Sequence, residues 1–287
     1  MPYVKRITKA GNTIEIEKYY TAKYNKKGGK RRDRVKATTE QQKKINTKQA
    51  ERKLRILMNA NFGYGDYHLE LDYIHEEGQP YREKEQMRHD LDVFLREARK
   101  EYKKAGLELK YIHVMEIGEK GARHHHLVIN QIDTKILQRC WYKAYEGHNR
   151  IKVFPLDDSG NYAKLAHYFV KYTDKVIKTD MALQGKRWNA SKNLVRPEPE
   201  YEIISDKDYF RKEEKVPKEY SGEYYIDKES IESGLHNAEY SGYGFYRFIL
   251  VKLDIPQNIR QKNKTNVAVQ RLPIKHTKKG EVYEKSW

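Results

Sequence analysis

Residues 111–130 of this chain of 287 residues read YIHVMEIGEKGARHHHLVIN, a pattern typical of a tight β-hairpin. We expect two strands, at 109–117 and 123–130, with the turn GEKG between them. We consider the register in which this turn pairs Ile117 with Arg123. The register matters, because a shift of one residue would move every side chain of one strand to the other face of the sheet.

This hairpin gathers imidazole and carboxylate groups. Side chains alternate along a strand, so His124 and His126 project from one face and His125 projects from the other. In the expected register Glu116 lies opposite His124, with the two Cβ atoms about 5 Å apart. Two imidazoles and one carboxylate on a single face predict a site for a divalent metal ion.

The composition limits what such a metal site can use. Cys140 is the single cysteine, which excludes cysteine-based zinc sites and leaves His, Asp and Glu as ligands. Two imidazoles and a carboxylate suit Mn²⁺, Co²⁺ or Zn²⁺, and Mg²⁺ also fits if phosphate and water complete its shell. The alternative interpretation is a polar strand end with an adventitious metal, and His125 is better explained as a core or supporting residue than as a ligand.

The order of the expected elements indicates the fold class. A strand at 67–74, whose alternation places His68, Glu70 and Asp72 on one face, precedes an amphipathic helix with a regular apolar stripe. The hairpin, a helix, a strand and a last helix follow. This split βαβ order predicts an α+β fold with a ferredoxin- or RRM-like antiparallel sheet and helices mainly on one face. The expected later elements span 82–104, 133–142, 150–154 and 161–175.

We expect four parts along the chain. Residues 1–60 form a basic arm of hairpin, loop and helix, and 61–195 form the central domain that holds the hairpin. Residues 196–253 are a charged region with one late strand at 242–253. The basic tail at 254–287 has the composition of a disordered segment.

The net charge of +17 predicts a polyanionic partner, and it is concentrated at the two ends. Residues 1–60 hold 18 Lys and Arg against 5 Asp and Glu, and residues 252–287 hold 9 against 3. Lys30, Arg31 and Arg32 stand in a glycine-containing loop suited to phosphate contact. The 24 tyrosines offer flat rings for stacking on unpaired bases. A solvated charged surface is the alternative explanation.

The last helix of the central domain, NYAKLAHYFVKYTDK at 161–175, has two pairs of residues four apart. Tyr168 and Tyr172 share one helical face, and Lys171 and Lys175 share an adjacent one. A phenol has an ordinary pKa of about 10 and attacks phosphorus poorly at neutral pH, but nearby cations favour its anion. The alternative is a packed aromatic face with a lysine rim.

Glu116, Gly121 and the His124-x-His126 pair, followed some forty residues on by Tyr168-x-x-Lys171-Tyr172-x-x-Lys175, resemble the motifs of HUH endonucleases that initiate rolling-circle replication. In that family a histidine pair binds a divalent ion, and a tyrosine attacks single-stranded DNA to leave a 5′-phosphotyrosyl enzyme and a free 3′-OH. The resemblance covers residues 67–194 and is closest to the two-tyrosine phage and plasmid type. His125 departs from it, because a bulky apolar residue is usual there.

The resemblance implies roles for particular residues. Glu116, His124 and His126 match the metal ligands, with Mg²⁺ or Mn²⁺ as the ion, and the two tyrosines match the nucleophiles. The segment QGKRWNASKNL at 184–194 is similar to the basic segment that follows the tyrosine helix in such initiators. Its Arg187, Trp188 and Lys192 would contact phosphates and stack on bases.

We therefore expect a replication initiator that nicks and rejoins single-stranded DNA at an origin. The sequence contains no GxxxxGK[ST] motif, which predicts no nucleotide cofactor and a separate host helicase. No apolar run is long enough to span a bilayer, so we expect no membrane partner and a location in the cytoplasm of a bacterial host. A transposase or relaxase of the same chemistry and a non-catalytic single-strand-binding protein are the alternatives. A histidine-triad hydrolase is disfavoured, because it needs alternating histidines on one face.

Overall fold

The computed structural model describes residues 3–21, 39–75, 77–78, 80–118, 121–146, 149–177, 187–212, 215–236 and 243–253. The chain divides into two compact units, Met1–Lys252 and Leu253–Trp287, and every element described below belongs to the first. The basic loop around Arg31 and the tail at 254–287, for which the sequence predicts phosphate contact and disorder, lie outside the described residues.

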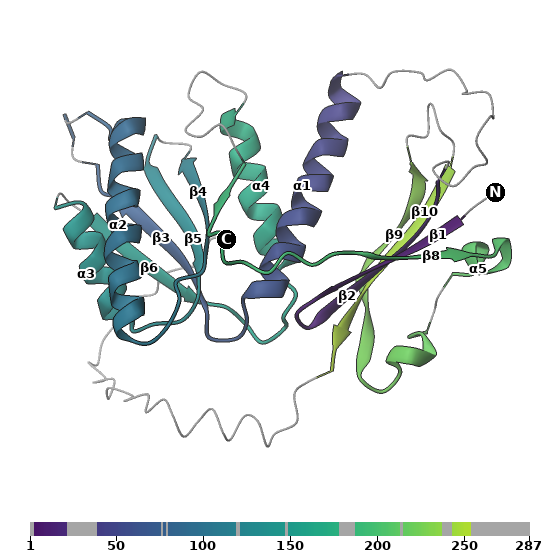
Figure 1. Cartoon of the computed structure of the whole chain (residues 1–287). Helices are drawn as coiled ribbons and strands as arrows, with labels where there is room; N and C mark the ends of the chain where they lie inside the picture. The colour runs from purple at the N-terminus through teal and green to yellow at the C-terminus, as the bar shows by residue number, and fades with distance from the viewer. Residues whose placement is uncertain are drawn as a thin grey trace, which may run out of the picture. The chain divides into compact units, whose positions relative to one another are not determined.

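The described elements form two five-stranded antiparallel sheets, which confirms the α+β class (Figure 1). We call the first the histidine sheet. Its strand order is β6-β3-β5-β4-β7, and the strands are β3 (Tyr67–Tyr73), β4 (Tyr111–Ile117), β5 (Arg123–Ile129), β6 (Asn149–Pro155) and β7 (Asn189–Ala190).

The second, which we call the terminal sheet, joins segments from both ends of the described chain. Its strand order is β8-β1-β2-β10-β9. The hairpin of the expected N-terminal arm and the late strand of the charged region are thus hydrogen-bonded neighbours in one sheet. Its strands are β1 (Tyr3–Ala10), β2 (Thr13–Tyr20), β8 (Glu200–Ile204), β9 (Tyr224–His236) and β10 (Tyr243–Lys252).

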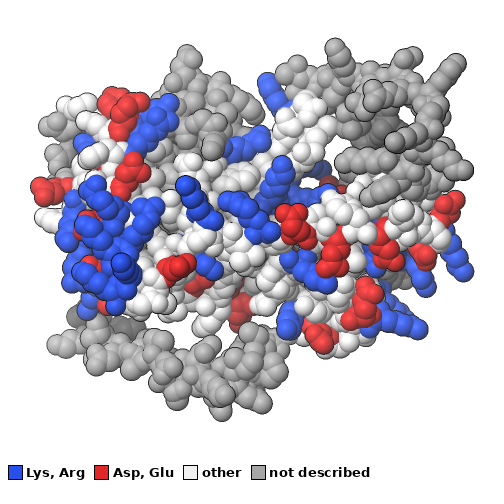
Figure 2. Space-filling model, in the orientation of Figure 1, with Lys and Arg blue, Asp and Glu red and all other residues white. Residues whose placement is uncertain are grey.

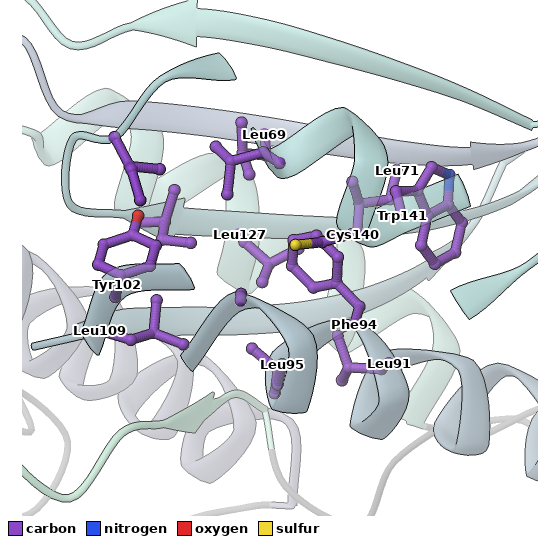
Figure 3. Packing of buried hydrophobic residues seen from close by; sticks show 14 of the residues in the cluster. Leu69, Leu71, Leu91, Phe94, Leu95, Tyr102, Leu109, Leu127, Cys140 and Trp141 are labelled. Carbon is purple, nitrogen blue, oxygen red and sulfur yellow. The ribbon is translucent and has the colours of Figure 1, made fainter. Parts of the chain in front are cut away.

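Helices lie on both faces of the histidine sheet. On one face α2 (Lys84–Lys104) and α3 (Thr134–Ala144) cover a core that includes Phe94 and Trp141 (Figures 1 and 3). On the other face α1 (Thr39–Asn61) and α4 (Ala163–Ile177) pack against a second core. The expectation of helices mainly on one face is therefore wrong, because α1 and α4 each bury an apolar stripe against the opposite side of the sheet.

Local sequence explains where these elements begin and turn. Asp133 caps α3 by accepting a hydrogen bond from the backbone N–H of Lys135 at 2.9 Å. In the hairpin between β4 and β5, Gly121 has a φ of 81°, a backbone conformation that glycine adopts without strain. The stripe of α2 that the sequence predicts is buried in the structure: Met87, Leu91, Phe94, Leu95, Ala98 and Tyr102.

Two elements that the sequence analysis does not predict, β8 and β9, are the edge strands of the terminal sheet. Their side chains are mostly exposed or partly exposed, so neither strand carries the alternation that marks a half-buried strand. The helix α5 (Asp206–Phe210) and the short 3-10 helix Lys218–Tyr220 lie between them in the chain. These two strands form because β8 pairs with β1 and β9 pairs with β10, and their own sequence patterns do not indicate them.

The terminal sheet contacts α1 through charged and close-packed groups. The carboxylate of Glu15, 3% exposed, pairs with the guanidinium groups of Arg52 and Arg55. In the turn between β1 and β2, Gly11 has a φ of 55°, and a Cβ there would lie 2.0 Å from the carbonyl oxygen of Asn59. Only glycine permits this approach of the hairpin to α1.

The Glu15 pairings give a first prediction. Replacing Glu15 with Gln leaves two arginines without their shared counter-charge, and we expect the free energy of unfolding to fall by about 3 kcal/mol. The exposed pair of Glu40 with Lys44, at 3.5 Å, provides a matched control, since Glu40→Gln should cost less than about 1 kcal/mol. Urea denaturation followed by circular dichroism measures both. Equal losses in the two variants would contradict a structural role for Glu15.

Candidate metal and nucleophile site

The register of the histidine sheet brings the predicted residues to one face. Glu116 is the direct partner of His124, as the hairpin predicts, and Ile117 pairs with Arg123. On the other side of β5, His126 lies opposite Glu70 and His124 lies opposite Asp72. The face that α4 covers therefore carries two imidazoles from β5 between carboxylates of β3 and β4.

His126 and Glu116 form a close pair with no hydrogen bond between them. Their Nε2 and Oε2 atoms are 2.6 Å apart, both side chains are buried, and neither atom has a hydrogen-bond partner in the described structure. The other nitrogen of His126, Nδ1, lies 3.2 Å from Nε2 of His68. Burial and the neighbouring His126 lower the pKa of His68 to about 3, so His68 is neutral.

This arrangement fits a shared cation. If Nδ1 of His126 donates to His68, then Nε2 of His126 is a bare acceptor that faces a carboxylate oxygen, itself an acceptor. Two buried acceptors in close contact require a positive charge near them. A metal ion supplies that charge without the in-line geometry that a proton would need.

His124 is oriented by a carboxylate. Its Nδ1 lies 2.8 Å from Oδ1 of Asp72, which can only accept, so Nδ1 carries the proton. This leaves Nε2 as the unprotonated nitrogen, the tautomer that a metal-binding imidazole adopts when a carboxylate holds its other nitrogen. Burial alone would raise the pKa of Asp72, but hydrogen bonds with His124 and Arg150 hold it well below its usual range.

Donor atoms of Glu70, Asp72 and His124 all lie within 4.8 Å of one another, so this group could also hold a metal ion. Its carboxylates, however, already have cationic partners. Arg150 pairs with Asp72 at 2.7 Å, and Lys152 pairs with Glu70 and, at 3.2 Å, with Asp72. Glu116, by contrast, has no Lys or Arg partner among the described residues, so its negative charge is available to a metal ion.

His125 belongs to the opposite face, as the sequence predicts. It is fully buried, with Nε2 at 2.9 Å from the hydroxyl of Tyr73 and Nδ1 at 3.0 Å from Nε2 of His113. Burial, followed by the neighbouring histidines, lowers its pKa well below the ordinary value. Tyr73 in turn donates to Asp90 at 3.1 Å. His125 is therefore a neutral core residue within a hydrogen-bonded chain and not a ligand on the metal face.

The tyrosine helix lies over the same face as His126. The rings of Tyr168 and His126 meet edge to face with centroids 5.5 Å apart, and Tyr172 lies 4.5 Å from Tyr168. Burial raises the pKa of the Tyr168 hydroxyl, and the charge and hydrogen bonding of Glu116 raise it further. Lys171 is exposed on α4, while the side chain of Lys175 lies outside the described residues.

The predicted nucleic-acid contacts of the later segment lie beside α1. The guanidinium of Arg187 donates to the carbonyl oxygen of Asn46 at 3.3 Å, and Trp188 packs at the margin of the second core. Both line a groove of about 500 Å³ together with Lys53 of α1. Lys192 is exposed. Lys30, Arg31 and Arg32 lie outside the described residues, so their predicted role is untested.

Sequence reasoning missed the groups that support the site: His68, Glu70, Asp72, Arg150 and Lys152. The alternation of β3 indicated that the first three share a face, but the sequence did not show in which register β3 pairs with β5. The two cations come from β6, on the far side of β3. Only the strand order of the sheet reveals these partners.

The fold and the site together define a class of structure: an antiparallel sheet whose histidines and carboxylates lie under a helix that carries tyrosines. Residues 69–177 match the family model described as "Replication-associated protein ORF2/G2P". The matched residues run from β3 to the end of α4 and so include every predicted metal ligand and both tyrosines. The comparisons with curated proteins and with solved structures gave no match.

Among the described residues, no helix is long and apolar enough to cross a bilayer. A separate feature of the matched region is its exposed Lys and Arg side chains, which cluster over α2 and α3, at the left in Figure 2. The near-zero net charge of the middle of the chain therefore conceals a basic surface, which contains Arg96, Arg99, Lys103, Lys104, Lys135 and Arg139.

The two carboxylate environments give a second prediction. Replacing Glu116 with Gln should weaken Mn²⁺ binding by more than about tenfold, because it removes a carboxylate that has no Lys or Arg partner among the described side chains. Replacing Glu70 with Gln should have a smaller effect, because Lys152 already neutralises that group. Isothermal titration calorimetry of the two variants makes the comparison. A larger loss for Glu70→Gln would place the ion at Glu70, Asp72 and His124 instead.

Proposed function

We propose that this protein nicks and rejoins single-stranded DNA at a replication origin by a metal-assisted attack of tyrosine on phosphorus. The observation that carries the proposal is the position of Tyr168, whose ring packs on His126 and whose hydroxyl interacts with Glu116. A nucleophile and a candidate metal pair thus share one buried face. The family match over residues 69–177 supports a role in replication.

In this mechanism His124, His126 and Glu116 hold the ion, and Asp72 and His68 fix the orientation of the two imidazoles. A bound Mg²⁺ or Mn²⁺ would polarise the scissile phosphate and lower the barrier to attack. The positive charge also opposes the effects of burial and of Glu116, which hold the pKa of Tyr168 above its ordinary value. The tyrosine would therefore be a weak nucleophile until the ion and the substrate are both present.

Attack by the Tyr168 oxygen forms a phosphotyrosyl ester at the 5′ side of the nick and releases the 3′ oxygen. The ester keeps the energy of the phosphodiester bond, so the 3′-OH can later reverse the reaction. Tyr172, one turn further along α4, is placed to make a second attack. Lys171 and Lys175 would neutralise charge that develops on the phosphate.

The proposed partners follow from this chemistry. In-line attack needs a strand that its complement does not constrain, so the substrate is extruded or looped single-stranded origin DNA. A separate host helicase would unwind the duplex. Arg187, Trp188 and Lys192, together with the loop at Lys30, Arg31 and Arg32, would bind the strand outside the reacting centre.

The third prediction tests the nucleophiles. With labelled single-stranded DNA of its own replicon and Mn²⁺, the protein should give a covalent band on a denaturing gel. Tyr168→Phe should reduce the first adduct by more than about a hundredfold. Tyr172→Phe should keep that adduct but lose the later joining step. A complete absence of adduct from the parent protein on cognate strands would exclude the enzyme and favour a binding protein.

The fourth prediction separates catalysis from binding. Because affinity for DNA comes mainly from cations that release counterions, His126→Ala should abolish nicking yet keep the dissociation constant for single-stranded DNA within about threefold. Fluorescence anisotropy at several salt concentrations measures the binding, and the slope should match that of the parent. Equal loss of binding and nicking would contradict this division of labour.

A further inference from the structure

Three aromatic rings form a column that leads from the reacting centre to an exposed surface. His68 stacks on His126 with centroids 5.4 Å apart and an interplanar angle of 29°. Phe154 stacks on His68 with the same separation and angle. His68 and Phe154 are direct partners on neighbouring strands β3 and β6, so the sheet itself maintains their contact.

The outer ring of this column is available for another ring. Phe154 is 45% exposed and belongs to neither hydrophobic core of the histidine sheet. A single exposed aromatic residue is common on protein surfaces. Phe154 differs because it is the accessible end of a stack whose buried end is a proposed metal ligand, on the edge strand of the sheet.

Phe154 also lines a groove that can receive a ligand. The groove has a volume of about 980 Å³, and its lining includes His68, Tyr162, Leu165 and a second exposed aromatic residue, Tyr225. This size is at the upper end of the range of about 300–1,000 Å³ that is typical of ligand sites. The groove therefore offers a flat apolar surface and sufficient space beside His68, whose ring centroid lies 6.3 Å from that of Tyr168.

The charges of the groove are mixed: Lys48 pairs with Glu232 and Lys164 is exposed, while several carboxylates also line the groove. Its arginines are engaged internally, since Arg52 and Arg55 pair with Glu15, and Arg247 pairs with Glu232. Asp157 and Asp227 also line the groove and would repel a phosphate. A nucleobase is flat and uncharged, and carboxylates can accept hydrogen bonds from its N–H groups.

We propose that Phe154 is the stacking platform for an unpaired nucleobase next to the scissile phosphate of the single-stranded DNA substrate. The inference rests on the proposed nicking function and adds a substrate-positioning subsite to it. Stacking on Phe154 extends the ring column by one base and anchors the strand beside Tyr168. Because every base has an aromatic face, the subsite positions the strand more than it selects a sequence.

The test measures stacking without cleavage. In the Tyr168→Phe/Tyr172→Phe double variant, single-stranded oligonucleotides carry 2-aminopurine at each position around the nick in turn. We expect fluorescence quenching at a position that flanks the scissile phosphate. Adding Phe154→Ala should abolish that quenching and weaken binding about tenfold, the loss of one base stack, whereas Phe154→Trp should preserve both.

Phe210, on α5, supplies the matched control, since it is 71% exposed and does not line the groove. Phe210→Ala should leave quenching and affinity unchanged. Thermal melting followed by circular dichroism checks that each variant is folded. Two results would overturn the proposal. One is unchanged quenching and affinity in the folded variant that carries Phe154→Ala. The other is a lack of quenching at every position in the tyrosine double variant that retains Phe154.

An adduct assay separates this proposal from the nicking function. An abasic site at the quenched position should lower adduct formation by the parent about tenfold and should have little further effect in Phe154→Ala. If the parent forms no adduct but the base is quenched by Phe154, the nicking proposal fails and the stacking subsite stands. If adducts form equally well with and without the base, the subsite fails and the nicking function stands.

Discussion

The strict alternation of side chains along β5 is the constraint on which the rest of the site depends. Within three consecutive residues it sends His124 and His126 to the face under α4 and His125 into the core under α2 and α3. The pairing of Glu116 with His124 maintains this arrangement. A slip of one residue would bury the two imidazoles of the proposed metal site in the apolar core and expose the residue that the core needs.

The core explains why the register is well defined. His125 satisfies both ring nitrogens through Tyr73 and His113, and an apolar residue in its place would leave those groups without these partners. The departure of His125 from the usual apolar residue of the HUH pattern is thus compensated by a local hydrogen-bonded chain. On the opposite face, His126 and Glu116 differ from the hydrogen-bonded imidazole–carboxylate pair of the site, His124 and Asp72. Nε2 of His126 and Oε2 of Glu116 are buried and have no hydrogen-bond partner among the described residues. If Nε2 of His126 is unprotonated, as the site geometry allows, these two buried acceptors favour the binding of a cation between or beside them.

The sequence predicts the parts of the site that depend on local periodicity. The hairpin register and the buried stripe of α2 both depend on spacing within one element or one turn. Family resemblance, and not periodicity, assigned Tyr168 and His126 to one site, and their contact was not predicted. The partners of His124 and His126 could not be predicted, because Asp72 and His68 reach them only through the pairing of β3 with β5. For the same reason the pairing of β2 with β10, which are more than two hundred residues apart, has no local signal. The helices on both faces were missed because an apolar stripe shows that a helix is buried but not against which face.

The position of the arginines changes how the net charge should be interpreted. Residues 1–60 carry most of the excess of Lys and Arg, which by itself predicts an arm that grips DNA. Arg52 and Arg55, however, turn inward to neutralise Glu15, and Arg6 pairs with Glu17. Arg52 and Arg55 stabilise the contact between the terminal sheet and α1, and Arg6 is paired within that sheet, so these cations would release no counterions in the proposed DNA binding. In the proposed complex with DNA, the protein would therefore neutralise fewer phosphates than the charge count suggests. The exposed cations over α2 and α3, within a region of near-zero net charge, contribute more than composition indicates (Figure 2).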